Sequence, residues 1–165
     1  MCGLFHESNA LRWGNDVGLG MKDLAERSSE QWQELWSLLD QLQTIDPIKL
    51  VESRGGNRRD DGVIELPWNS YHSFVVQIEM LLYSLKAVQE DIGWSQWKSQ
   101  VDPDLVFDAG RIMSGSMYDT VCLLTGIIRS ERYGSGAIAT SLRNGSFMTL
   151  LNHLRDLICN PPLDH

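Results

Sequence analysis

The sequence lacks the features that identify several large classes of protein. Its three cysteines are widely separated in a chain of 165 residues, so we expect no disulfide framework, and the expected compartment is a reducing cytoplasm. No apolar run approaches the roughly 18 residues that a membrane-spanning helix needs. The N-terminus has no basic segment followed by a long apolar core, so we expect no signal peptide and no membrane association.

Basic charge is also scarce. The formal net charge is −8, whereas a general nucleic-acid binder needs a basic stripe that displaces counterions from phosphates. The charge therefore argues against a nucleic-acid partner. It permits a basic protein partner without indicating one, because acidic chains are commonly acidic for solubility alone.

Standard catalytic and cofactor motifs are missing as well. We find no Walker loop, dinucleotide fingerprint, H-E-x-x-H, C-x-x-C or nucleophile elbow. The four histidines are scattered, and no two have the spacing of metal ligands, so we expect no metal and no cofactor. Whether the chain is an enzyme stays open on these grounds.

Apolar periodicity predicts five helices, at 30–43, 69–89, 116–132, 137–143 and 146–158. Ser116 followed by Asp119 predicts a capping box at the start of the third helix. That helix is apolar around most of its circumference, so we expect it at the centre of the fold.

Two short β-prone runs, 48–53 and 63–67, flank a loop rich in Gly, Asn and Asp. They predict a β-hairpin with a long loop. Because an isolated hairpin is marginal in water, this one must lie against helices or gain another strand. The expected fold is α+β and mostly helical, with about five helices around a central apolar helix and one hairpin.

The expected domain organisation is simple. Residues 21–160 form a single globular domain, since the chain has the length of one core and contains no repeats or low-complexity segment. Residues 1–20 are rich in Gly and Asn without a clean period. We expect an N-terminal arm that is poorly ordered, with Phe5 and Trp13 as the residues that would otherwise fix it to the body.

The stretch IIRSERYGSGAIATSLRNG holds the first candidate site. Arg129 falls on a mostly apolar helix, so its charge needs a partner, and Arg132 lies on the adjoining sector. One interpretation, which we favour, is a structural ion pair within the chain. The other is a clamp for an acidic ligand, in which Gly134 and Gly136 offer backbone N–H groups. The internal carboxylates considered are Glu65, Glu79, Asp102, Asp104 and Asp108.

The hairpin loop and several aromatic residues supply further candidates. Arg58 and Arg59 stand in a Gly-rich, mixed-charge loop, which is typical of solvent exposure, with a scaffolded binding loop as the alternative. If the chain is an enzyme, the candidates for proton transfer are Tyr71, His72 and Tyr133. Three tryptophans near helix breakers are candidates for an interface or for core filling: Trp68, Trp94 and Trp97.

Two blocks of the sequence resemble an uncharacterised family of small bacterial domains of unknown function. The resemblance covers roughly residues 29–158. The first block has the pattern G-G-x-R-R-x-D-G-V, and the second ends a helix with L-x-R-x-x-R-[FY]-x-x-G. The matching residues are Gly55, Gly56, Arg58, Arg59, Asp61, Gly62, Val63, Arg129, Arg132, Tyr133, Gly136 and Gly145. The resemblance implies no activity, but it suggests that the hairpin loop and the 129–136 turn line one cleft.

Two functions are compatible with these observations. The first is a non-catalytic protein-binding module acting as a regulator, immunity factor or inhibitor, which fits the acidic charge, the small size and the missing catalytic motifs. The alternative is a small enzyme or ligand-binding protein that holds an acidic group with Arg129 and Arg132. The oligomeric state is not readable from the sequence.

Overall fold

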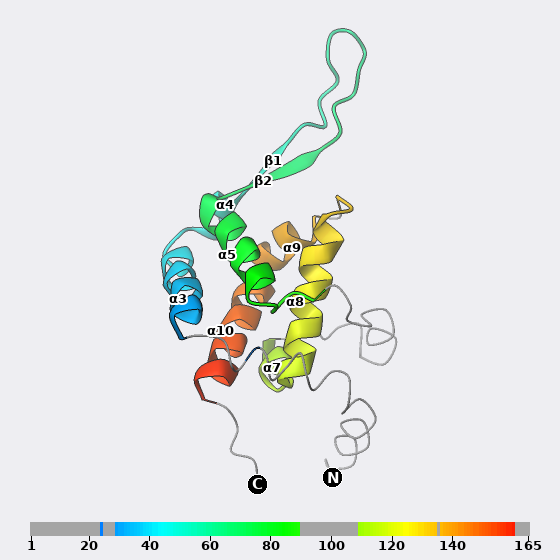
Figure 1. Cartoon of the computed structure of the whole chain (residues 1–165). Coiled ribbons are helices and arrows are strands. Elements are labelled where there is room, and N and C mark those ends of the chain that lie inside the picture. The colour runs from blue at the N-terminus through cyan, green and yellow to red at the C-terminus, as the bar shows by residue number, and fades with distance from the viewer. Residues whose placement is uncertain (1–23, 25–28, 90–108, 135, 161–165) are drawn as a thin grey trace, which may run out of the picture.

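The computed structural model describes residues 24, 29–89, 109–134 and 136–160. Within them, seven helices accompany a two-stranded antiparallel hairpin (Figure 1), which confirms the mostly helical α+β fold. The strands are β1 (Val51–Arg54) and β2 (Trp68–Tyr71). The helices are α3 (Ser29–Gln43), α4 (Pro47–Leu50), α5 (Ser73–Ser84), α7 (Ala109–Met113), α8 (Met117–Glu131), α9 (Ala137–Arg143) and α10 (Ser146–Cys159).

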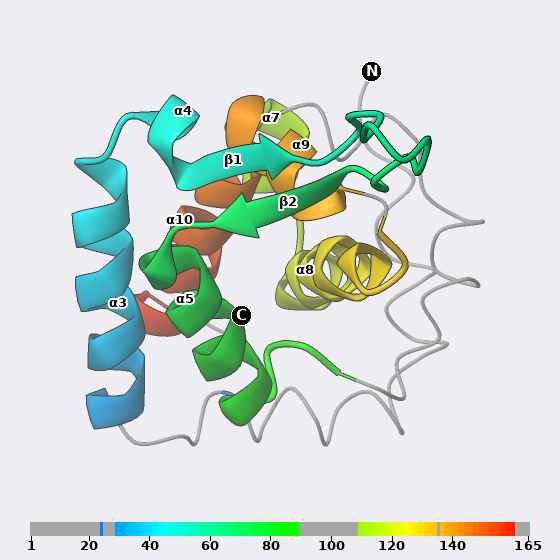
Figure 2. The ribbon, with the colours of Figure 1, turned by 90° about the horizontal axis from the view of Figure 1, so that it is seen from above.

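Helix α8 supplies the centre of the core. All residues from Thr120 to Ile128 are buried, so this helix is covered on every side along its middle turns. Helices α9 and α10 pack against it, α10 also contacts α3 and α7, and α5 packs on α3 (Figure 2). A helix that is apolar around its circumference belongs inside, and the position that the sequence predicts for it is confirmed.

Local chemistry fixes where the helices begin. The Ser116 side chain accepts the Asp119 N–H (3.2 Å), and the Asp119 carboxylate accepts the Ser116 N–H (3.0 Å), so the predicted capping box is present. His72 caps α5, because its Nδ1 accepts the Phe74 N–H at 3.2 Å. Helix α9 begins after Gly136, whose φ of 66° places it in the left-handed region.

A hairpin is present, as the sequence predicts, but its two strands lie at other residues than predicted. The run 48–53 begins as helix, because the Asp46 carboxylate caps α4 by accepting the Ile48 N–H (3.0 Å) and Pro47 suits the first turn. The second strand is 68–71 and not 63–67. The predicted helix at 69–89 is therefore shortened at its start, and Tyr71 belongs to β2 and not to a helix. It is also shortened at its end, since α5 stops at Ser84.

Residues 55–67, the hairpin arm, continue the hairpin away from the helices (Figure 1). Val51 pairs with Tyr71 in the strands and Arg58 bridges Ile64 farther out with the same offset, but the ladder between them is interrupted, because Gly55 and Gly56 are both left-handed (φ 77°). The Arg59 N–H donates to the Val63 carbonyl (2.8 Å), which closes a turn with Gly62 at φ 83°. Every residue from 56 to 68 is exposed. The sequence analysis expected the hairpin to lie against helices or to gain another strand, whereas only its base lies against helices.

Two further classes of structure are absent from the described ranges. No helix there is long and apolar enough to cross a membrane. No group of three or more His, Cys, Asp or Glu side chains in the same ranges is arranged to hold a metal ion.

Candidate functional site

A single carboxylate joins the hairpin to two helices. Glu131, the last residue of α8, accepts the Tyr71 hydroxyl with one oxygen, and its other oxygen accepts the Ile138 N–H at 3.0 Å. Gly136 has no side chain to cap α9, so Glu131 supplies the missing acceptor from the neighbouring helix. We call this contact of β2, α8 and α9 the hairpin junction.

The hairpin junction keeps Tyr71 in its neutral form. Burial raises the pKa of the Tyr71 hydroxyl above its usual value, and the hydrogen bond to Glu131 raises it further. The hydroxyl therefore remains a hydrogen-bond donor near neutral pH. A group with this pKa is poorly suited to exchange protons with a substrate, so the geometry favours a positioning role for Tyr71.

Arg132 faces residues of its own chain. Its guanidinium carbon lies 5.0 Å from the centre of the Tyr83 ring on α5. Burial raises the pKa of the neighbouring Glu79, and the positive charge of Arg132 opposes that rise. Arg129 is half-buried in the last turn of α8 and also has an interaction partner. Arg132 therefore lies over the Tyr83 ring and near Glu79, which is one of the carboxylates considered in the sequence analysis.

The turn between α8 and α9 touches the base of the hairpin. A Cβ added at Gly136 would lie 3.2 Å from the Asn69 side-chain nitrogen, so this position approaches β2 closely. Asn69 accepts the Ser53 hydroxyl (3.0 Å), and Arg143 of α9 donates to the same Ser53 oxygen (3.1 Å). Gly134 is also left-handed, with φ at 68°. The turn and the hairpin therefore meet through polar side chains.

The hairpin-loop arginines do not share in this contact. Arg58 and Arg59 lie on the outer part of the arm, where both are exposed, and Arg59 Nε is 3.7 Å from the Asp61 carboxylate. The second family-like block meets the hairpin at β2, while the loop that carries the arginines of the first block extends away from the turn (Figure 1). Tyr133 is exposed at the turn, and His72 serves as the cap of α5.

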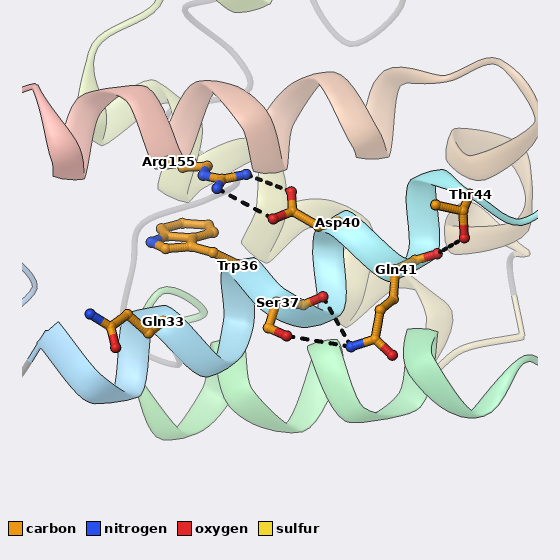
Figure 3. A pocket seen from close by; sticks show the side chains of 7 residues that line it. All are labelled: Gln33, Trp36, Ser37, Asp40, Gln41, Thr44 and Arg155. Atoms are coloured by element: carbon orange, nitrogen blue, oxygen red, sulfur yellow. Dashed lines mark hydrogen bonds and ion pairs between the residues drawn. The ribbon is translucent and has the colours of Figure 1, made fainter.

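A shallow groove of about 530 Å³ lies between α3 and α10, far from the candidates above. Its charges neutralise one another, since Arg155 donates to both Asp40 oxygens at 2.7 and 3.5 Å (Figure 3). Arg155 also lies 5.9 Å from the Trp36 ring centre. The other polar side chains that line the groove carry amide or hydroxyl groups: Gln33, Ser37, Gln41 and Thr44. Sequence reasoning missed this groove, because Asp40 and Arg155 are 115 residues apart and form no motif.

The arm and the start of β2 carry large apolar side chains in solvent. The exposed fractions are 53% for Val63, 64% for Ile64, 82% for Leu66 and 55% for Trp68. Arg54, which pairs with Glu52 at 2.7 Å, lies 5.6 Å from the Trp68 ring centre. The sequence analysis named Trp68 as a candidate for an interface or for core filling. It assigned the apolar residues of 63–67 to a strand of the hairpin. Trp94, Trp97 and residues 1–20 lie outside the described residues.

Comparisons with known proteins identify the chain only at the level of a family. No curated protein and no solved structure matches it. A profile of the family of unknown function DUF6508 matches residues 27–160, which is most of the chain and includes both of the arginine-bearing blocks. The chain therefore belongs to DUF6508, a family of unknown function.

Proposed function

We propose that the chain is a non-catalytic protein-binding module of the bacterial cytoplasm, acting as a regulator, immunity factor or inhibitor, and that the hairpin arm is its contact surface. One observation carries the proposal: Val63, Ile64, Leu66 and Trp68 stand in solvent on a segment held away from the body. Contiguous exposed apolar side chains on a soluble domain commonly mark an interaction site.

The ligand-binding alternative has weaker support. A clamp for an acidic group needs free guanidinium donors at a concave surface. Arg132 instead stacks on Tyr83 beside Glu79, and the high pKa of Tyr71 fits a structural hydrogen bond better than proton transfer. The groove between α3 and α10 lies elsewhere and contains none of these residues.

Site-specific photo-crosslinking in the cells that make the protein tests the proposal. A benzophenone side chain placed at Leu66 should form an adduct with another protein upon irradiation. The same group at Met80, which is 66% exposed on α5, is the matched control and should form none. A Leu66 position that yields no adduct with another protein, or yields the same adducts as Met80, would remove the arm from the proposed function.

A further inference from the structure

Helix α5 contains one charged residue, Glu79, and its side chain is half-buried. Among the residues that the structure describes, none donates a hydrogen bond to the Glu79 carboxylate or forms an ion pair with it. Its own helix offers no cation either, because the residues one turn away in both directions are uncharged. These residues are Val75, Val76, Leu82 and Tyr83.

The charges that act on Glu79 come from the end of α8. The Arg132 guanidinium lies 5.0 Å from the centre of the Tyr83 ring, and Tyr83 is one turn beyond Glu79 on α5. The carboxylate of Glu131 precedes Arg132 in the chain and also acts on Glu79. Two carboxylates and one guanidinium therefore share a small region of the surface. We call Glu79, Tyr83, Glu131 and Arg132 the α5–α8 corner.

The Glu131 carboxylate is fixed at this corner. One of its oxygens accepts the Tyr71 hydroxyl, and the other accepts the Ile138 N–H at 3.0 Å, so turning away from Glu79 would break the hairpin junction. Burial raises the pKa of the Glu79 carboxyl above its usual value, the positive charge of Arg132 lowers it, and the negative charge of Glu131 raises it. The sum of these effects is a raised pKa.

The other elements around α5 bring no further cation to Glu79. On the hairpin side, Tyr71 is neutral, and the His72 ring nitrogen is engaged in capping α5. Lys86 is exposed beyond the end of α5. Helices α3 and α8 lie on opposite sides of α5 (Figure 2), and the charged residues of α3 are all acidic: Glu30, Glu34 and Asp40.

We propose that the α5–α8 corner is a proton-operated contact, in which Glu79 binds one proton under mildly acidic conditions and thereby fastens α5 to the end of α8. Protonation removes the charge that burial penalises. It also leaves Glu131 and Arg132 as one negative and one positive charge. Because Glu131 also holds Tyr71, the contact lies next to the hairpin junction. The inference goes beyond the proposed function, since it concerns the body of the domain and holds whatever the arm binds.

The direction of the pH effect follows from the raised pKa of Glu79. The folded chain takes up this proton at a pH at which an unfolded chain, with an ordinary glutamate, does not. The stabilisation is therefore absent above the folded pKa, grows as the pH falls through it, and is complete below the ordinary value of 4.5. Glu52 behaves in the opposite way, because its hydrogen bond to Arg54 lowers its pKa and is lost in acid.

An NMR titration of the glutamate side-chain carboxyl carbons of the full chain tests the proton site. The Glu79 signal is identified by its loss in Glu79→Gln, and it should titrate at a higher pH than an ordinary glutamate. Arg132→Gln should raise the Glu79 midpoint further, because it removes the opposing positive charge. Glu131→Gln should lower it, because it removes the repelling negative charge. Glu34→Gln, at an exposed position of α3, is the control and should leave it unchanged.

Opposite shifts in the Arg132 and Glu131 variants are the result that a purely packing role of Glu79 would not produce. A Glu79 carboxyl that titrates as an ordinary glutamate would overturn the inference. So would a midpoint that moves in the same direction in both variants.

Urea denaturation at two pH values tests the consequence for stability. At about pH 7.5 the midpoint of Glu79→Gln should exceed that of the wild type, because the amide never carries the penalised charge. The difference should shrink toward about pH 5, where the wild type has taken up the proton. Glu34→Gln should follow the wild type at both pH values. A difference between Glu79→Gln and the wild type that is the same at both pH values overturns the inference, since it would reflect packing alone.

Discussion

The base and the arm of the hairpin differ in what holds them. At the base, Tyr71 is bonded to Glu131, and the Ser53 hydroxyl lies between Asn69 and Arg143. The arm is held by its own backbone hydrogen bonds, such as that from the Gly56 N–H to the Glu65 carbonyl (2.8 Å). Backbone pairing and turn residues are thus sufficient to shape a ribbon, whereas side-chain contacts are needed to fasten it to a body.

Among the variants that test how the base is held, Glu131→Ala is expected to lower the free energy of unfolding most. The substitution removes the acceptor of the Tyr71 hydroxyl and of the Ile138 N–H, so two donors lose their partner. We expect the free energy of unfolding to fall by about 2 kcal/mol, measured by urea denaturation. Glu34→Ala, at an exposed position of α3, is the control and should change it by less than about 0.5 kcal/mol. Equal effects would show that the junction does not fasten the hairpin.

A smaller effect is expected from Gly136→Ala. The alanine would strain a residue at φ 66° and press on Asn69, so we expect a loss of about 1.5 kcal/mol. Gly134→Ala has a matched φ of 68°, but an added Cβ there meets nothing within 4 Å. It should cost about 1 kcal/mol. The difference between the two losses measures the contact with β2, and identical losses would contradict its importance.

The smallest effect is expected from Leu66→Asp on the monomer. The side chain is exposed, so its replacement should alter the free energy of unfolding by less than about 0.5 kcal/mol. Thermal unfolding followed by circular dichroism provides the measurement. A loss of 2 kcal/mol or more, of the size expected for a packed leucine, would mean that the arm is covered within the monomer.

The sequence predicted those elements whose causes are local. Ser116 and Asp119 sit three residues apart and form the capping box, and the apolar circumference of 120–128 marks a buried helix. Tyr71 was misplaced because Asn69 to Tyr71 precede the apolar face of α5 and were taken as part of that helix. Nothing within four residues indicates that Tyr71 pairs with Val51. Strand position depends on such distant pairing, and local propensity does not contain it.

The candidate site likewise has features that local sequence predicts and features that depend on distant contacts. That Arg129 needs a partner follows from a charge on an apolar helix, which is a local argument. That the Arg132 guanidinium lies over Tyr83 depends on how α5 packs near α8, and no spacing within one helix reports it. The role of Glu131 was missed for the same reason, because its partners, Tyr71 and the start of α9, come from two other elements.

The offset shared by the two ends of the hairpin makes the length of the arm a variable that is independent of the body. Val51 with Tyr71 and Arg58 with Ile64 keep the same offset, so one residue can be added to or removed from each strand without disturbing the base. Each such pair moves the turn by about 3.3 Å and exchanges the two faces of everything beyond it. Changes of two pairs restore the faces. Lengthening or shortening by such double steps would therefore change the reach of the arm and keep the orientation of its turn.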